Sequence, residues 1–247
     1  MNVLVPMGGS DEAFRERGFA YCKPLVEIHG KPMIEHAWNC LRALQPEKFV
    51  FVVRKEDVLR SHLHRVLKLM DPTSVVVQAE GPTAGAACTA LLAIDQIKPD
   101  AELIVTNGDQ LLECDLAAVL ADFRARKLDA GTIVFDSVHP RWSFVRVGAD
   151  GFVTEAAEKR PISRQATAGF YYFRRGADFL RAATDMIRKD AQVNGLFYVC
   201  PTFNEMILAG AKIGVHAIAR DAYISLATPQ NVDEYEQRPP RSALGKG

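Results

Sequence analysis

The chain has 247 residues, 48% hydrophobic and 24% charged, so it is long enough for one large globular domain with a sizeable core. Its 30 lysines and arginines balance 30 aspartates and glutamates without a basic cluster, which disfavours a protein that grips the backbone of a nucleic acid. No apolar run approaches the roughly 20 residues of a membrane helix, so neither nucleic acid nor membrane is an expected partner.

Strands and helices are predicted to alternate over the first half of the chain. β-Branched runs indicate buried strands, and apolar residues at helical spacing indicate helices between them. The expected strands cover residues 3–5, 49–53, 75–77, 103–105 and 132–135, and the expected helices cover 33–44, 58–69, 85–97 and 116–126. This alternation predicts an α/β fold with a mostly parallel, twisted sheet and helices on both faces. Ligands of such sheets bind at the carboxyl ends of the strands.

The sequence pattern changes after Phe135. Residues 144–147 and 152–155 flank a Gly-Ala-Asp-Gly turn and predict a β-hairpin, which a strand over 168–173 and a helix over 178–189 follow. These elements indicate a small β-rich portion beside the parallel sheet. No linker or repeat divides the chain, so we expect a single domain over 1–237 and a flexible C-terminal tail over 238–247.

The cysteines are widely spaced and include no Cys-x-x-Cys pair; they are Cys22, Cys40, Cys88, Cys114 and Cys200. That distribution is typical of reduced thiols rather than of a zinc or disulfide site. The first residues carry no pattern typical of a secretory signal. We therefore expect a cytoplasmic protein.

Glycines follow the first predicted strand, in the run Pro-Met-Gly-Gly. Backbone N–H groups at a strand-to-helix junction can cradle phosphate oxygens, which makes Met7, Gly8 and Gly9 candidates for nucleotide binding. Two glycines alone are a weak signal, because a tight turn uses glycine for steric reasons.

A longer motif follows over residues 19–34, with Lys-Pro-Leu at 23–25 and Gly-Lys-Pro at 30–32. This segment resembles the signature of the sugar nucleotidyltransferases, also called nucleoside-diphosphate-sugar pyrophosphorylases. The resemblance implies a Rossmann-like catalytic domain and makes Lys23 the catalytic cation at the α-phosphate. Lys31 is better explained as a turn residue before a helix.

Residues 78–87 resemble the family's base-reading strand and loop. By that resemblance Gln78 would hydrogen-bond the base, and Thr83 and Gly85 would lie against the nucleotide. From the residues alone, Gln78 is a polar residue at a strand end and Gly85 the start of a helix.

Residues 106–110 resemble the family's glycine–aspartate metal site. Asn107 and Gly108 would then bind the nucleotide, and Asp109 would be the catalytic carboxylate that holds Mg²⁺. A carboxylate at a strand end can bind Mg²⁺ against a triphosphate while the ion keeps several waters. The resemblance thus implies Mg²⁺ as the cofactor.

Glu158, Lys159, Arg160 and Pro161 resemble the element with which the family binds a sugar phosphate. Glu158 would accept from substrate hydroxyls and Lys159 would face the phosphate. Gly169 and Tyr198 complete the expected substrate-binding residues, although a core position explains Tyr198 as well.

Two departures from the family pattern put the activity in question. The family's first loop reads glycine-x-glycine-x-arginine, and here Asp11 replaces the second glycine and Ala13 the arginine that binds the β- and γ-phosphates. Arg15 or Arg17 is a candidate substitute. Near the C-terminus, Ser225 stands where the family has a second metal-binding aspartate.

The resemblance implies a nucleotidyltransferase that couples a nucleoside triphosphate to a sugar 1-phosphate and releases pyrophosphate, in capsule or other surface polysaccharide biosynthesis. A small non-sugar phosphate, such as a phosphocholine-type or phosphorylated amino-acid-derived compound used with CTP, is an alternative acceptor. A weak or inactive nucleotide- or sugar-phosphate-binding protein on the same fold, and a glycosyltransferase, stay open as other functions. A homo-oligomer is also left open.

Overall fold

β-Branched and aromatic residues form the central strands, and most of their side chains are buried. The computed structural model describes residues 1–238, so the predicted tail lies outside the described residues apart from Arg238. Within this range nine strands form the main sheet: β1 (Asn2–Met7), β4 (Lys48–Arg54), β5 (Val75–Ala79), β6 (Leu103–Thr106), β8 (Ala130–Asp136), β9 (Ser143–Val147), β10 (Val153–Glu158), β11 (Gln165–Phe173) and β12 (Ile213–Ala217).

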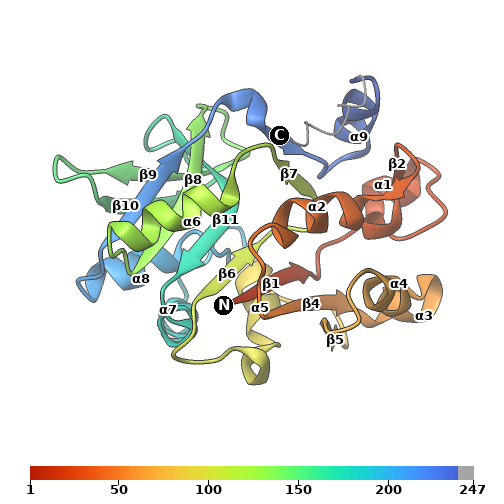
Figure 1. Cartoon of the computed structure of the whole chain (residues 1–247), viewed down its shortest axis with the longest axis horizontal. Helices are drawn as coiled ribbons and strands as arrows, with labels where there is room; N and C mark the ends of the chain where they lie inside the picture. The colour runs from red at the N-terminus through yellow and green to blue at the C-terminus, as the bar shows by residue number, and fades with distance from the viewer. Residues whose placement is uncertain (239–247) are drawn as a thin grey trace.

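The sheet has a parallel half and a largely antiparallel half. Strands β5, β4, β1 and β6 are adjacent and parallel. Strand β11 then pairs antiparallel with β6, β8 and β9, while β10 pairs antiparallel with β9 and β12 pairs parallel with β8. Figure 1 shows the two halves side by side, with β4 and β5 at one end and β9 and β10 at the other. The predicted α/β fold is confirmed, with a mixed, mostly parallel central sheet and an antiparallel portion.

Successive side chains of a strand point to opposite faces of the sheet, so a strand of apolar residues presents apolar side chains on both faces. Helices cover both of these faces. Val3 and Val5 belong to one apolar core and Leu4 to the other. The first core includes α2 (Met33–Arg42), α4 (Leu63–Met70) and α6 (Leu116–Ala125), and the second includes α5 (Ala86–Leu91), α7 (Gly176–Arg188) and α8 (Thr202–Leu208). In Figure 1, α2 and α6 lie across the same face.

Two predicted helices are shorter than expected. The pattern over 58–69 is divided between α3 (Lys55–Ser61) and α4, because His62 between them has a left-handed backbone, with φ of 50°, which a right-handed helix does not continue. The pattern over 85–97 forms α5 and the short 3₁₀ helix η2 (Ile94–Gln96). No helix within residues 1–238 is long and apolar enough to cross a bilayer.

Smaller elements surround one end of the sheet. Strand β2 (Glu27–Ile28) pairs with β3 (Lys31–Pro32), and β7 (Gln110–Leu112) pairs with β13 (Tyr223–Ser225). The remaining helices in the described chain are α1 (Glu12–Glu16), η1 (Lys23–Leu25), η3 (Arg220–Ala222) and α9 (Pro229–Glu236). A third apolar cluster, which includes Phe14, Ile28 and Ile224, joins several of them. The β7–β13 pairing brings a segment near the C-terminus against the segment that follows β6.

Candidate active site

A cavity of about 640 Å³ lies where β1, β4 and β6 end. Its wall includes Met7 at the end of β1, Arg54 at the end of β4 and Asn107 just after β6. The antiparallel half supplies the opposite wall through Ser143 and Glu158. This is the edge at which open α/β sheets bind their ligands.

The predicted site residues lie together in this cavity with one exception. Its lining includes Met7, Gly8, Gly9, Lys23, Thr83, Gly85, Asn107, Gly108, Asp109, Glu158, Lys159, Gly169 and Tyr198. Gln78 is exposed on β5 and is not among the residues that line the cavity. Its contact with a base stays a prediction that no feature of this cavity supports.

Lys23 and Asp109 form an ion pair on the cavity wall. Lys23 begins η1, and its ammonium Nζ donates to Asp109 Oδ2 at 2.5 Å. The backbone N–H of Leu226 donates to the carbonyl of Asp109 at 2.8 Å, so the strand β13 segment holds the loop that carries this carboxylate. Both side chains keep part of their surface open, 18% and 28% respectively. A bound ligand can therefore reach a cation and a carboxylate at one point.

Gly85 joins the two sides of the cavity. Its φ is +106°, and a Cβ at this position would lie 2.4 Å from the carbonyl oxygen of Phe197. Backbone hydrogen bonds on either side, from Phe197 N–H to Ala84 and from Ala87 N–H to Phe197, measure 2.8 and 3.0 Å. The glycine thus permits two segments far apart in sequence to pack backbone against backbone.

Gly85→Ala is expected to lower the free energy of unfolding by about 2 kcal/mol, since an alanine is strained at this φ and its Cβ meets backbone that cannot rotate away. Urea unfolding of the purified variant measures the change. Gly81→Ala is the matched control, because nothing lies within 4 Å of a Cβ there. Equal stability of the two variants would show that the close approach has no energetic consequence.

Glu158 is a buried carboxyl at the end of β10, 8% exposed. Ser143 Oγ donates a hydrogen bond to its Oε2. Burial raises the pKa of Glu158, while that hydrogen bond and the charge of Lys159 oppose the shift. Next to it, Lys159 Nζ donates to the hydroxyl of Tyr198 at 2.9 Å. These side chains give this end of the cavity a hydrogen-bonding carboxyl beside an ammonium group.

The raised pKa of Glu158 predicts a pH-dependent stability. A carboxyl whose pKa is higher in the folded state contributes stability that is present below its unfolded pKa, about 4, and lost as the pH rises through the folded value. The stability of the parent protein relative to Glu158→Gln should therefore fall as the pH rises above about 4 and through the raised pKa of Glu158. Urea unfolding at a series of pH values tests this, and a difference that does not change with pH contradicts it.

The altered first loop is held by a cluster of charged side chains. Asp11 is buried, and Arg54 contacts its two carboxylate oxygens at 3.0 and 2.7 Å. The same guanidinium donates to both oxygens of Asp57 at 2.9 and 2.6 Å. Although burial acts to raise it, the hydrogen bond and charge of Arg54 keep the pKa of Asp11 below its usual value. Arg54 thus compensates the negative charge that Asp11 brings to the loop.

The two arginines expected as substitutes for the missing loop arginine lie elsewhere. Arg15 contacts Asp11 at 3.2 Å and Glu56 at 3.6 Å, and Arg17 pairs with Asp233 at 2.6 Å. Neither lines the cavity. In this structure both are engaged in ion pairs with carboxylates of the protein itself.

Ser225 lies beside the Asp109 segment. It pairs with Gln110 across the β13–β7 ladder and lines the cavity together with Asp109. Its hydroxyl accepts from the N–H of Ala227 at 3.3 Å. Within residues 1–238 no three His, Cys, Asp or Glu side chains are grouped so as to hold a metal ion.

Sequence reasoning missed several side chains of the cavity wall, among them Arg54, Arg141 and Trp142. The position of Arg54 directly after the second predicted strand was a usable signal, since ligand-binding residues gather at strand ends. Arg141 and Trp142 lie between β8 and β9, in a loop whose course no sequence pattern indicates.

Comparisons with known proteins agree with this geometry. A family model described as nucleotidyl transferase matches residues 6–197. The chain is 30% identical over 181 residues to the bifunctional protein GlmU of Pseudarthrobacter chlorophenolicus, a match that covers 68% of this chain and 36% of that protein. It is 27% identical to the UTP–glucose-1-phosphate uridylyltransferase AglF of Haloferax volcanii, over 96% of each chain.

A solved structure extends the likeness to the whole fold. The nucleoside-diphosphate-sugar pyrophosphorylase of Vibrio cholerae superposes with a TM-score of 0.82 at 25% identity, over 96% of this chain and 100% of that one. This chain thus spans about a third of the GlmU relative but nearly all of AglF and of the Vibrio protein. The resemblance stated from the sequence is confirmed, and the chain belongs to the nucleotidyl transferase family.

Proposed function

We propose that this protein transfers a nucleotidyl group from a nucleoside triphosphate to a sugar 1-phosphate or a similar small phosphorylated acceptor. A phosphate oxygen of the acceptor forms a bond to the α-phosphorus, the bond from that phosphorus to the bridging oxygen of the β-phosphate breaks, and pyrophosphate leaves with the electron pair. Catalysis of such a displacement depends mainly on positioning and on neutralising charge.

The ion pair of Lys23 and Asp109 is the observation that carries this proposal. It lies in one cavity with the glycine loop of Gly8 and Gly9 and with the Glu158–Lys159 element. A triphosphate on the glycine loop and an acceptor at Glu158 and Lys159 would meet near the Lys23 ammonium. Its positive charge would then stabilise the charge that develops on the α-phosphate.

The remaining predicted residues receive roles by their place on the wall. Glycine backbone at Gly8, Gly9 and Gly108 would lie against the nucleotide, together with Met7, Thr83, Gly85 and Asn107. Glu158 would accept a hydrogen bond from an acceptor hydroxyl, and Lys159 would contact the acceptor phosphate. Gly169 and Tyr198 would complete the acceptor side.

Asp109 supplies part of the ligand set that a Mg²⁺ ion requires. Mg²⁺ binds through one or two carboxylates together with substrate phosphates and waters, and Asp109 supplies one partly exposed carboxylate on the wall of the cavity. Ser225 beside it offers only a hydroxyl. When bound, the ion would supply positive charge at the triphosphate. We include Mg²⁺ in the proposal as a ligand held by Asp109 and by the substrate itself.

A nucleoside-diphosphate sugar is an activated glycosyl donor, so this product would serve the synthesis of capsule or another surface polysaccharide. AglF, which matches over 96% of each chain, bears the name of an enzyme that uses UTP and glucose 1-phosphate. We propose a cytoplasmic enzyme that acts as one domain over residues 1–237.

Pyrophosphate release tests the proposal. Each common triphosphate is incubated with Mg²⁺ and a panel of sugar 1-phosphates and small phosphorylated alcohols. We expect release that requires one triphosphate and one acceptor, with formation of the corresponding nucleoside-diphosphate product. Hydrolysis of a nucleotide sugar without any triphosphate would indicate a glycosyltransferase instead.

One observation favours the alternative of a weak or inactive binding protein. Arg54, which contacts the altered loop at Asp11, is already paired with two carboxylates, and neither Arg15 nor Arg17 lines the cavity. The β- and γ-phosphates would then lack the guanidinium that the family places there. Ligand-induced thermal stabilisation without any pyrophosphate release would support this second function.

A further inference from the structure

A chain of hydrogen bonds connects the cavity wall with a buried amide. Gln110 is only 4% exposed and is not among the residues that line the cavity. Its Nε2 donates to the carbonyl of Gly169 at 3.0 Å and to Thr106 Oγ1 at 3.3 Å. Its Oε1 accepts from Asn107 Nδ2 at 3.1 Å, and Asn107 does line the cavity. Gln110 can therefore influence a ligand only through its neighbours.

The backbone of β11 determines which way round both amides lie. A backbone carbonyl can only accept a hydrogen bond, so the atom of Gln110 that faces Gly169 must be its nitrogen. The oxygen of Gln110 then faces Asn107 and accepts from its nitrogen. The orientation of the Asn107 amide thus follows from that of Gln110.

Gly169 leaves the two amides no room to move apart. Its φ is +60°, and a Cβ at this position would lie 2.3 Å from Asn107 Nδ2 and 2.5 Å from Gln110 Oε1. The backbone N–H of Asn107 also donates to the carbonyl of Gly169, at 3.2 Å. This close packing restricts rotation of the Asn107 side chain.

The Asn107 oxygen is open to solvent. In the described part of the chain Oδ1 accepts no hydrogen bond, and it is not among the side-chain atoms that are buried without a partner. Because its nitrogen is turned toward Gln110, Asn107 offers this oxygen to a ligand in the cavity. An amide oxygen accepts hydrogen bonds, so it suits a hydroxyl and repels the oxygens of a phosphate.

We propose that Gln110 is a positioning residue, which holds Asn107 so that Oδ1 accepts a hydrogen bond from a substrate hydroxyl. This inference rests on the proposed function and deepens it. Asp109, two residues after Asn107, pairs with Lys23 at the proposed reacting centre. The hydroxyl would therefore belong to a group that flanks the α-phosphate, either the ribose of the triphosphate or the sugar of the acceptor.

A double-mutant cycle tests the positioning. We measure kcat/KM for pyrophosphate release, and Kd for the triphosphate and for the sugar 1-phosphate by calorimetry, in the parent, Asn107→Ala, Gln110→Met and the double variant. Each single variant should lower kcat/KM about tenfold, the value of one hydrogen bond. Because Gln110 acts through Asn107, adding Gln110→Met to Asn107→Ala should change kcat/KM by less than about twofold. A tenfold loss that persists in the Asn107→Ala background, or no loss in either single variant, overturns the inference.

Substrates that lack one hydroxyl identify the contact. The 2′-deoxy and 3′-deoxy triphosphates and deoxy forms of the sugar 1-phosphate are compared with the complete substrates. One of them should lower kcat/KM of the parent about tenfold and that of Asn107→Ala by less than about twofold, which assigns the hydroxyl to the ribose or to the acceptor. If each analogue is penalised equally in both proteins, the hydroxyl contact is wrong. If the loss in Asn107→Ala disappears at high Mg²⁺ concentration, the oxygen binds the ion instead and the hydroxyl contact is again wrong.

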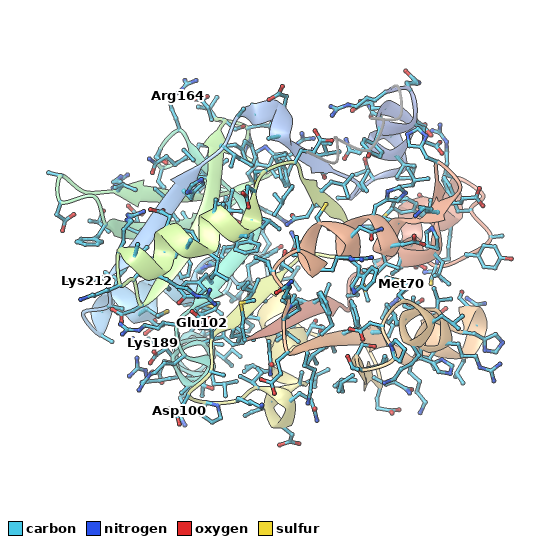
Figure 2. The ribbon with its side chains drawn as sticks, viewed as in Figure 1. Met70, Asp100, Glu102, Arg164, Lys189 and Lys212 are labelled. Atoms are coloured by element: carbon cyan, nitrogen blue, oxygen red, sulfur yellow. The ribbon has the colours of Figure 1, made fainter. Side chains whose placement is uncertain are left out.

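Arg164→Met is the control for a lost polar side chain beside the same strand. Arg164 directly precedes β11, projects from the outer edge of the β-rich half (Figure 2) and is 70% exposed, so kcat/KM should stay within about twofold.

Urea unfolding shows whether Gln110→Met is folded. If it is not, Gln110→Glu replaces it, since glutamate has the same shape and its carboxylate cannot donate to Gly169. If neither variant folds, Gln110 serves the fold alone and the inference is wrong. Coupling of the two residues in Kd without any pyrophosphate release would refute the proposed function while supporting the role of Gln110.

Discussion

Lys23→Met is expected to lower kcat for pyrophosphate release by about 10²–10³-fold, the usual cost of removing one preorganised charge from a reacting centre. Methionine keeps the length of the side chain and removes the ammonium that lies 2.5 Å from Asp109. Because the lost interaction would form most strongly in the transition state, the effect should appear in kcat and persist at saturating substrate. Initial rates with the preferred triphosphate and acceptor measure it.

Lys31→Met is the matched control, since Lys31 belongs to the neighbouring Gly-Lys-Pro motif. Its side chain is 52% exposed and pairs at 2.7 Å with Glu35, which lies four residues later in the chain, in α2. An exposed pair of this kind contributes little, so the rate should stay within about twofold. A Lys23→Met enzyme that kept more than a tenth of the parent rate would remove Lys23 from the catalytic centre.

Local sequence patterns predicted the elements that form the parallel half of the sheet. The strands at β1, β4, β5 and β6 lie where β-branched runs indicated them. Most side chains of β1, β4 and β6 are buried, whereas β5 is at the end of the sheet and is only partly buried. The pairing of β12 with β8 is different, since it joins Ile213 to Ala130 across more than eighty positions of sequence. Such a register depends on tertiary packing, which local periodicity does not encode.

The candidate site was predictable to the extent that it is built from contiguous motifs. Lys23 and Asp109 were found separately, each within its own motif, and the fold brings them together. Arg141 could not be found in this way, because its position depends on Trp142, which it contacts, and Trp142 in turn packs against Phe135 and Tyr223 from separate segments. Residues that act through partners distant in sequence require the structure.

The altered first loop shows how one substitution changes the role of a neighbouring arginine. Asp11 places a carboxylate where the family has glycine, and the chain buries it to 5% exposure. A buried carboxylate needs a charged partner, which Arg54 supplies while it also holds Asp57. All three guanidinium nitrogens of Arg54 thereby donate to Asp11 or Asp57. Arg54 is therefore better explained as a structural residue that holds the loop than as a phosphate ligand.

Arg54→Met is therefore expected to lower the free energy of unfolding by about 3–5 kcal/mol, the usual cost of leaving buried charges without their partner. Asp11 and Asp57 would both lose the guanidinium, and their side chains are only 6% and 4% exposed. Urea unfolding near neutral pH measures the change, with the midpoint and the slope fitted separately to detect a loosened native state.

Two further variants identify the cause of that loss. Arg60→Met removes a 68% exposed arginine from the adjacent helix α3 and should change stability by less than about 0.5 kcal/mol. The triple variant Arg54→Met, Asp11→Asn, Asp57→Asn removes the buried charges together and should recover most of the lost stability, because no ion is left unpaired. If the Arg54→Met variant instead keeps the stability of the parent protein and has a higher KM for the triphosphate, the guanidinium binds the nucleotide. The structural role assigned to Arg54 is then wrong. Recovery in the triple variant would assign Arg54 to the loop, and neutralisation of the triphosphate charge would then depend on Lys23 and Mg²⁺.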